Sequence, residues 1–179
     1  MKLRALDVPD GTTVTYAYNG DGLRTSETNG GATSRFAWDV TTRVPSLLDD
    51  GTNSYIYGPD GSVVEQIADS GGATNYFYTD SIGSTRALLG SDGMVSGTYT
   101  YDAYGSVVAQ TGAAQTPIQF AGAYHDPLTN LYYLVNRYYD PSTAQFLTVD
   151  PLVSSTGAAY VYGGSSPTTQ VDPAGLWAV

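Results

Sequence analysis

The sequence predicts an all-β protein built from short antiparallel hairpins. The chain of 179 residues contains 16 tyrosines and 21 glycines, and only 13% of its residues are charged. Tyrosine favours pleated, half-buried surfaces, and glycine supplies the positive φ angles of tight turns. A helical period of 3.6 is weak throughout, and glycine and proline recur too often for long helices. The length suits one compact domain with a sizeable core.

The hairpins are predicted by an aromatic-x-aromatic element that recurs along the chain, mostly followed by a turn residue. The five copies begin at Tyr16, Phe36, Tyr55, Tyr76 and Tyr99. Aromatic residues at i and i+2 share one face of a strand, and clusters of Asn, Asp and Gly then reverse the chain. Each unit of about 20 residues is too small to bury its own aromatic face, so stacked neighbours are expected to form a continuous sheet.

A different segment begins after residue 116, where the repeat ends. Proline fixes its own φ and keeps the preceding residue out of the helical region, so an Asp-Pro step marks a strand exit into a turn that the aspartate can cap. Four such steps follow, at Asp126-Pro127, Asp140-Pro141, Asp150-Pro151 and Asp172-Pro173. The chain therefore divides into a hairpin array at 1–116 and a C-terminal unit at 117–179.

Composition argues against several functions. A net charge of -10 is unsuited to nucleic acid, because phosphate backbones require clustered Lys and Arg. No apolar run approaches the roughly 20 residues that span a bilayer, and the opening MKLRALDVPDG lacks the apolar stretch of a secretory signal. With no cysteine and one histidine, we expect no disulfide, thiol chemistry, zinc site or other cofactor.

The order of these motifs resembles a known family. The aromatic hairpins resemble YD repeats, and the final third of the chain resembles the RHS repeat-associated core domain. The ordered core motifs, which are highly specific, are Leu-Tyr-Tyr at 131–133, Tyr-Tyr-Asp-Pro at 138–141, Phe146 with Asp-Pro at 150–151, and Asp-Pro-Ala-Gly-Leu at 172–176. The resemblance covers nearly the whole chain.

The resemblance implies a fold and an activity. In that family the repeats form a spiral β-sheet, or partial shell, around a C-terminal toxin, and the core closes the shell. The core acts as an intramolecular aspartyl protease on its own C-terminal segment. Carried over to this sequence, the essential arginine is Arg137, the two aspartates are Asp140 and Asp150, and the cut falls between Leu176 and Trp177. Three residues follow that point, so we expect the toxin domain of the parent protein to be absent here.

The resemblance also implies a bacterial location, secreted or at the cell surface, as part of a larger protein. Some positions depart from the family pattern. Ala144 and Gln145 stand where the family usually has Gly-Arg, and Asn130 stands where it often has Gly. Asn tolerates the left-handed backbone that Gly would adopt, whereas Ala is less suited to it. We expect these departures to weaken peak activity and to leave the site in place.

The implied chemistry needs one ionised carboxylate to activate water and one protonated carboxylate to donate to the carbonyl oxygen. Two close carboxylates divide their protons in this way because both cannot ionise together. Asp140 and Asp150 lie ten residues apart across a turn at PSTA, and antiparallel strands joined there would bring them to one face. Arg137 would hold one carboxylate in its charged form or polarise the scissile carbonyl.

Plainer roles stay open for the same residues. Asp-Pro aspartates often cap turns, and a lone arginine near aspartate is often a buried ion pair. The family match favours catalysis for the arginine and the two aspartates, whereas His125 and Asp126 are expected to be turn residues. Asp172 and Gly175 are expected to position the substrate, Asp172 by capping the turn that presents Leu176.

The alternative function is a non-catalytic β-spiral scaffold, or a module that binds carbohydrate or protein. Aromatic faces can stack on sugar rings, but the regular spacing of the tyrosines favours packing and cross-strand pairing. The first hairpin would also expose an unpaired sheet edge, which is a natural site for strand addition or self-association.

Overall fold

The computed structural model describes residues 2–8 and 11–176, and it confirms the all-β prediction. Antiparallel hairpins form one four-stranded sheet, then one eight-stranded sheet, then a second four-stranded sheet. The first sheet contains β1 (Ala5–Asp7), β2 (Thr13–Tyr18), β3 (Arg24–Asn29) and β4 (Ala32–Arg35). The third contains β13 (Tyr124–Asp126), β14 (Leu131–Leu134), β15 (Arg137–Asp140) and β16 (Gln145–Phe146).

The eight-stranded sheet lies between them in sequence. Its strands are β5 (Ala37–Asp39), β6 (Ser46–Asp49), β7 (Asn53–Tyr57), β8 (Val63–Ala68), β9 (Thr74–Thr79), β10 (Thr85–Gly90), β11 (Val95–Tyr101) and β12 (Val107–Gly112). Within each sheet, strands that follow one another in the chain are paired, as expected of successive hairpins. Among the residues that the structure describes, helix is limited to the short segments η1 (Phe120–Gly122), α1 (Val153–Thr156) and η2 (Gly163–Ser165).

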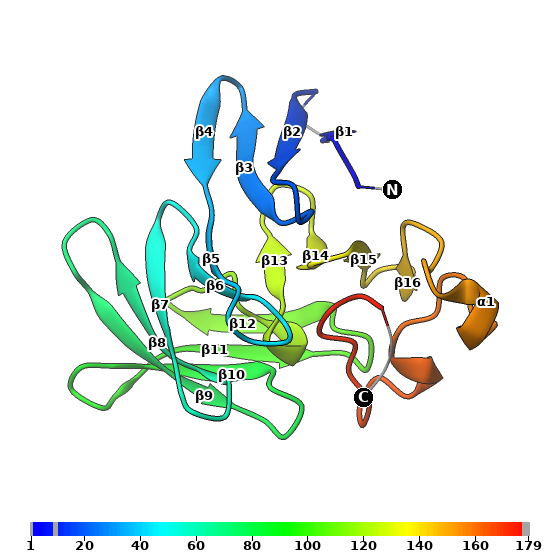
Figure 1. The fold of residues 1–179 in the computed structure, drawn as a ribbon. Helices are drawn as coiled ribbons and strands as arrows, with labels where there is room; N and C mark the ends of the chain where they lie inside the picture. The colour runs from blue at the N-terminus through cyan, green and yellow to red at the C-terminus, as the bar shows by residue number, and fades with distance from the viewer. Residues whose placement is uncertain (1, 9–10, 177–179) are drawn as a thin grey trace.

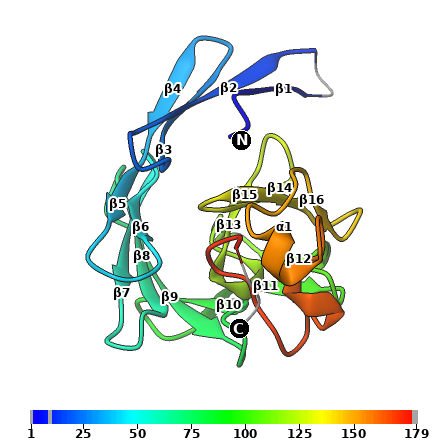
Figure 2. The same ribbon diagram turned by 45° about the vertical axis from the view of Figure 1, so that its right-hand side comes forward.

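The sheets follow one curved path that forms a partial shell (Figure 1). Figure 2 shows β1–β4, β5–β8 and β9–β12 arranged along the curve, with β13–β16 and the last described residues on its inner side. The C-terminal unit therefore fills the concave side of the hairpin array.

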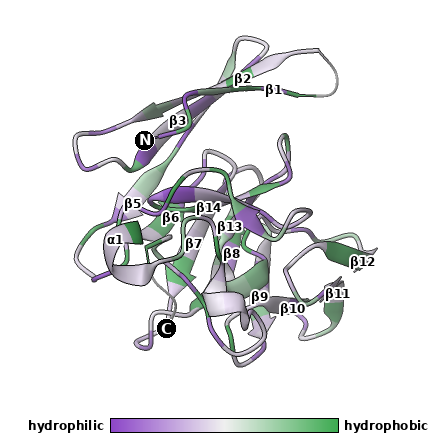
Figure 3. Ribbon diagram, turned by 90° about the vertical axis from the view of Figure 1, so that its right-hand side faces the viewer, coloured by the Kyte–Doolittle hydropathy of each residue, from purple (hydrophilic) through white to green (hydrophobic). Residues whose placement is uncertain are grey.

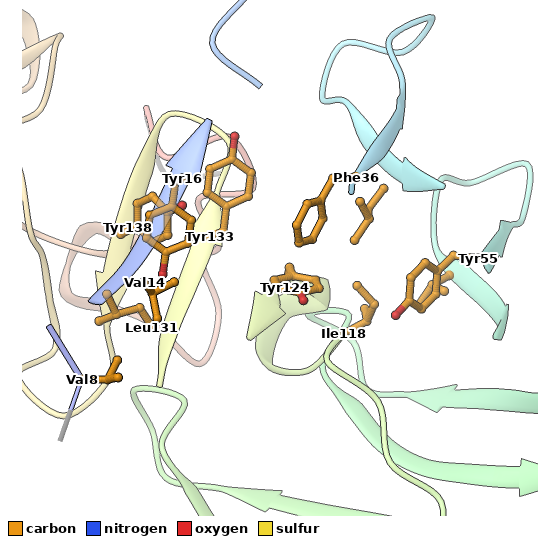
Figure 4. Close-up of a cluster of buried hydrophobic side chains, with 12 residues drawn as sticks. Val8, Val14, Tyr16, Phe36, Tyr55, Ile118, Tyr124, Leu131, Tyr133 and Tyr138 are labelled. Atoms are coloured by element: carbon orange, nitrogen blue, oxygen red, sulfur yellow. The ribbon is translucent and has the colours of Figure 1, made fainter. Parts of the chain in front are cut away.

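Two hydrophobic clusters join the array to the C-terminal unit. The first brings Val14 and Tyr16 of β2 against Tyr133 and Tyr138 of the third sheet, and Figure 4 shows these side chains facing one another. The second is built around Tyr139, whose ring stacks on Tyr162 with a centroid distance of 4.3 Å. Because both clusters contain residues of β14 and β15, this hairpin is packed on both faces.

The repeated aromatics divide into two groups. Tyr16, Tyr55 and Tyr99 are buried, as a core ladder requires. In β9 the faces are reversed: Tyr76 and Tyr78 are exposed on the outer side, Tyr78 by 63%. The residue between them faces inward instead, opposite the fully buried Leu88 of β10. A shift of one residue exchanges the two faces of a strand, and the identity of the aromatic alone does not reveal it.

Strand β12 is one of the two end strands of the large sheet, and β5 is the other. All six residues of β12 are exposed, and Val107 and Val108 add apolar side chains to an edge that pairs only with β11. In Figure 3 β12 lies at one side of the molecule and is coloured as largely hydrophobic. This edge is distinct from the predicted one at β1, which is an end strand of the first sheet.

The Asp-Pro steps form capped turns, as predicted. Asp126, Asp140 and Asp150 each accept a hydrogen bond from the backbone N–H two residues later, at 3.0, 2.9 and 2.7 Å. Asp172 accepts one from the N–H of Leu176 at 2.8 Å. In each case one carboxylate oxygen organises the local turn, which leaves the other oxygen available for contacts at longer range.

Candidate functional site

Arg137 is the centre of the candidate site. It is the first residue of β15, and its side chain is only 2% exposed. Its Nη2 donates to Oδ2 of Asp172 at 3.0 Å and lies 3.3 Å from Oδ2 of Asp150. Its Nε donates to the carbonyl oxygen of Gly175 at 2.6 Å, and the guanidinium lies 3.6 Å from the ring centroid of Phe146. One side chain thus binds two carboxylates and the backbone of the C-terminal segment.

Asp150 reaches this point from the turn after β16. Its N–H donates to the carbonyl of Ala159 at 2.7 Å, which anchors the residue. Its Oδ1 caps the turn through the N–H of Leu152 at 2.7 Å, while Oδ2 faces Arg137. The side chain is 5% exposed, so the ion pair is almost completely shielded from water.

Asp172 and Gly175 form the turn that carries Leu176. The carbonyl of Asp172 accepts the N–H of Gly175 at 3.1 Å, and its Oδ1 accepts the N–H of Leu176 at 2.8 Å. Gly175 has φ +66°, and a Cβ there would lie 2.6 Å from the carbonyl oxygen of Leu134. Only glycine satisfies both conditions. Asp172 therefore binds the backbone of Leu176 and also belongs to the charged cluster.

The guanidinium of Arg137 is buried, and only some of its N–H groups have hydrogen-bond partners in the described part of the chain. Burial lowers the pKa of Arg137, while the negative charges of Asp150 and Asp172 oppose that shift. Nη1 of Arg137 is buried and has no hydrogen-bond partner within the described residues. A guanidinium nitrogen that remains unpaired beside two carboxylates is a donor available to a further oxygen atom.

Asp140 occupies a different place from the one expected. Its Oδ1 accepts the hydroxyl of Ser142 at 2.6 Å and the N–H of the same residue at 2.9 Å. Burial pushes the pKa of Asp140 upward, but the hydrogen bonds from Ser142 and Thr143 outweigh it and hold the pKa below its usual range. The ion pairs of Arg137 are formed with Asp150 and Asp172 instead.

The reason for this difference is the period of the strand. Residues three apart in a β-strand point to opposite faces. Arg137 shares its face with Tyr139, in the cluster around Phe146, and Tyr138 belongs to the cluster on the other face. Asp140 follows Tyr138 in this alternation and so begins its turn on the face away from Arg137.

The remaining predicted positions lie in turns, in one strand or outside the described residues. His125, which was expected to be a turn residue, is instead the middle residue of β13 and pairs with Tyr132 of β14. Asn130 and Ala144 have φ of 57° and 59°, so both turns need the left-handed backbone that the family glycines would supply. His125 packs against the ring of Tyr132, and burial lowers its pKa. Leu176 is the last described residue, and Trp177 lies outside the described part of the chain.

A second buried cluster was not predicted from the sequence. Nη1 of Arg24 on β3 lies 3.0 Å from Oδ2 of Asp126 and 3.3 Å from Oε2 of Glu27. The hydroxyl of Tyr16 donates to the same oxygen of Asp126 at 2.9 Å, and the guanidinium faces aromatic rings, with that of Phe36 at 4.2 Å. Arg24 and Asp126 are 102 residues apart, and no local pattern indicates that they meet.

A groove lies near the candidate site. It has a volume of about 530 Å³ and lies between the hairpin array and the C-terminal loop, and its wall includes Trp38, Tyr57, Val135, Val171 and Pro173. Within the described ranges, no cluster of three or more His, Cys, Asp or Glu side chains has the arrangement of a metal site. Over the same ranges, none of the helices has the length and apolar character needed to cross a bilayer.

Comparisons with known proteins agree with this architecture. The family model described as the teneurin YD-shell matches residues 3–161. The tRNA3(Ser)-specific nuclease WapA of Bacillus spizizenii is 30% identical over 175 residues and 91% of this chain. The double-stranded DNA deaminase toxin A of Burkholderia cenocepacia is 31% identical over 166 residues and 80% of this chain. This chain spans only 7% and 12% of the lengths of these two relatives.

Solved structures with the same fold belong to much longer chains. The crystal structure of TcdB2-TccC3-Cdc42 superposes with a TM-score of 0.75 at 25% identity, over 92% of this chain and 9% of that one. The Photorhabdus luminescens Tc holotoxin pore superposes with a TM-score of 0.75 at 22% identity, over 100% of this chain and 9% of that one. The latter similarity concerns the fold alone.

Proposed function

This chain belongs to the teneurin YD-shell family, and on that premise we propose that it is part of an RHS-type toxin carrier that cuts its own backbone after Leu176. The cut would free a toxin domain that follows in the parent protein. The names of two relatives, a tRNA nuclease and a DNA deaminase toxin, support a carrier role, and so does the small fraction of their length that this chain spans. A bacterial location, secreted or at the cell surface, belongs to the same proposal.

One observation carries the proposal of self-cleavage. Asp150 and Asp172 meet at a single nitrogen of Arg137, and the N–H of Leu176 is bound by the second of these aspartates. The residue before the scissile bond is therefore tied to the carboxylate pair itself. A turn cap or a plain ion pair does not require that link.

The reaction is hydrolysis of the peptide bond between Leu176 and Trp177. One ionised aspartate takes a proton from water, whose oxygen attacks the carbonyl carbon of Leu176, while the other aspartate donates its proton to the carbonyl oxygen. Collapse of the tetrahedral intermediate breaks the C–N bond and passes a proton to the departing amine. The products are a carboxylate on Leu176 and an amine on Trp177. Neither aspartate is assigned the proton.

Arg137 has two roles in this scheme. Nη2 holds the two carboxylates together and reduces the cost of their proximity. Nη1, which is buried and unpaired, is suited to polarise the scissile carbonyl as negative charge develops on its oxygen. In this proposal Asp172 takes the place that the resemblance gave to Asp140.

The direct test is the intact mass of the freshly purified chain over a range of pH. We expect a species that ends at Leu176 in the wild type and only the full-length mass in Asp150→Asn. Circular dichroism of the variant checks that it is folded. A wild-type chain that stays full-length at every pH contradicts the proposal.

A second function is favoured by the exposed tyrosines of β9. Tyr76 and Tyr78 present their side chains to solvent on the outer face, where core packing does not account for them. We propose as the alternative that this face of the scaffold binds carbohydrate or protein. Binding to a glycan array that is lost in Tyr78→Ser would support it, and no binding by the wild type would count against the carbohydrate version.

A further inference from the structure

The turn of the β14–β15 hairpin touches the C-terminal segment at the proposed cleavage site. Leu134 and Arg137 pair across the hairpin, so Val135 and Asn136 form its two-residue loop. The N–H of Asn136 donates to the carbonyl of Leu134 at 2.5 Å and lies 3.2 Å from the carbonyl of Ala174. Its Nδ2 donates to the same carbonyl of Ala174 at 3.0 Å. Asn136 thus holds one carbonyl oxygen with two donors.

Three consecutive residues before the proposed cut are held through their backbone. Asn136 binds the carbonyl of Ala174, Nε of Arg137 binds the carbonyl of Gly175, and Asp172 binds the N–H of Leu176. No side chain of the bound segment is needed for these contacts. The segment from Ala174 to Leu176 is therefore held by backbone contacts, and the hairpin turn supplies the contact at its first residue.

The turn itself is strained and is braced from the opposite side. Val135 has φ 54°, which is unfavourable for a β-branched residue. Nζ of Lys2 donates to the carbonyl of Val135 at 2.6 Å, although the two residues are 133 positions apart. This hydrogen bond from a distant part of the chain stabilises a turn conformation that the local sequence disfavours.

The other face of the same hairpin is packed on the first sheet. The hydroxyls of Tyr18 and Tyr138 lie 3.0 Å apart, and the N–H of Arg24 donates to the hydroxyl of Tyr133 at 3.0 Å. The hairpin is thus placed between the first sheet and the C-terminal loop. The position of the loop depends on residues from the beginning of the chain.

We propose that Asn136 is a positioning residue for the cleavage, and that Lys2 braces it. By fixing the carbonyl of Ala174, the amide of Asn136 sets the bond after Leu176 against Asp150 and Asp172. This inference rests on the proposed function. It assigns a role to a residue whose hydrogen bonds are with the carbonyls of Leu134 and Ala174.

The first experiment measures the first-order rate of self-cleavage by mass spectrometry. Asn136→Ala and Asn136→Asp are expected to lower the rate about 10- to 100-fold, because a misplacement of about 1 Å can cost that much. Asn130→Asp is the matched control: it makes the same change in the neighbouring β13–β14 turn, and we expect it to stay within about twofold of the wild type. Lys2→Met should lower the cleavage rate less than the Asn136 variants do. Arg4→Met, its control, should leave the rate unchanged.

Two readouts separate positioning from a general loss of structure. The thermal midpoints of the Asn136 variants should stay close to that of the wild type. In Asn136→Asp, the rate relative to wild type should recover as the pH falls below about 4, because the protonated carboxyl regains a donor. Cleavage by Asn136→Ala at the wild-type rate would overturn the inference.

A separate measurement keeps the inference testable if the wild type does not cleave. In the Asp150→Asn background, hydrogen exchange reports the protection of the N–H groups of Gly175 and Leu176. Adding Asn136→Ala should increase their exchange at least about tenfold, since the loop loses its anchor. Unchanged exchange would overturn the inference that Asn136 holds the C-terminal segment. An uncleaved wild type in which Asn136→Ala still increases exchange would refute only the proposed protease activity.

Discussion

Arg24 and Arg137 each lie buried against two carboxylates, but the two clusters differ in what surrounds them. Arg24 is enclosed by aromatic rings, and its partner Asp126 also accepts hydrogen bonds from Tyr16 and from the turn that it caps. Asp126 is therefore well placed as the counterion of Arg24. Burial, with the nearby charge of Asp126, raises the pKa of Glu27 to about 8. Glu27 then acts mainly as a protonated group at neutral pH.

The raised pKa of Glu27 predicts a pH dependence of stability. The folded pKa lies above the unfolded value of 4.5, so this contribution is complete below pH 4.5 and is lost as the pH rises to about 8. Relative to Glu27→Gln, the free energy of unfolding of the wild type should fall by on the order of 4 kcal/mol across that window. Urea unfolding at several pH values measures it.

The control for this prediction is Glu65→Gln on β8, which pairs with the outward-facing Tyr76. Its free energy of unfolding is measured beside that of Glu27→Gln at each pH, so that the effect of the substitution type is subtracted. A difference between wild type and Glu27→Gln that is constant with pH, or that grows in favour of the wild type, would contradict the assignment.

Residue identities predicted part of the candidate site. Arg137 and Asp150, which the resemblance named, form an ion pair in the structure, and Asp172 binds the N–H of Leu176. Their roles in cleavage stay predictions. The sequence did not predict that Asp172 joins Asp150 at Arg137. The short sequence distance suggested Asp140 instead, but the alternation of side chains along β15 places Asp140 on the face away from Arg137. The strand period could have been applied to Arg137 and Asp140 from the sequence alone.

At the scale of elements, the hairpin turns differ in how closely they are packed. Gly105 and Gly61 both have positive φ, 93° and 80°, and both are followed by serine at the end of a turn. A Cβ on Gly105 would lie 2.5 Å from the ring of Phe120, whereas a Cβ on Gly61 would meet nothing within 4 Å. The turn after β11 is thus part of the core, and the turn after β7 is not.

This contrast predicts unequal costs for one substitution. Gly61→Ala carries only the penalty of the left-handed backbone, about 1–2 kcal/mol. Gly105→Ala carries the same penalty and also displaces Phe120, which should add about 1–3 kcal/mol. Denaturant unfolding of the two variants measures the difference. Equal losses of stability would contradict the packing of this turn.

The elements themselves were largely predictable. The aromatic repeat and the turn residues indicated the hairpins, because each motif is local. The reversed faces of β9 were not indicated: Tyr76 and Tyr78 fit the repeat, but the register with Leu88 turns Phe77 inward. Register depends on the neighbouring strand, and so it is not contained in the motif.

At the scale of the whole molecule, the β14–β15 hairpin joins three parts of the chain. One face packs on the first sheet, and the other carries Arg137 and holds the C-terminal loop. The contacts that establish this arrangement join residues more than 100 positions apart, such as Lys2 with Val135 and Arg24 with Asp126. Contacts of this range follow from the curvature of the shell, which no short motif specifies.

The rates of self-cleavage of Asp172→Asn and Asp140→Asn, measured by intact mass beside the wild type, test the central claim most directly. We predict that Asp172→Asn stays full-length and that Asp140→Asn is cut after Leu176 at a rate within about tenfold of the wild type, since its carboxylate caps a turn on the other face. The reverse result, with Asp140→Asn uncut and Asp172→Asn cut normally, would contradict the account.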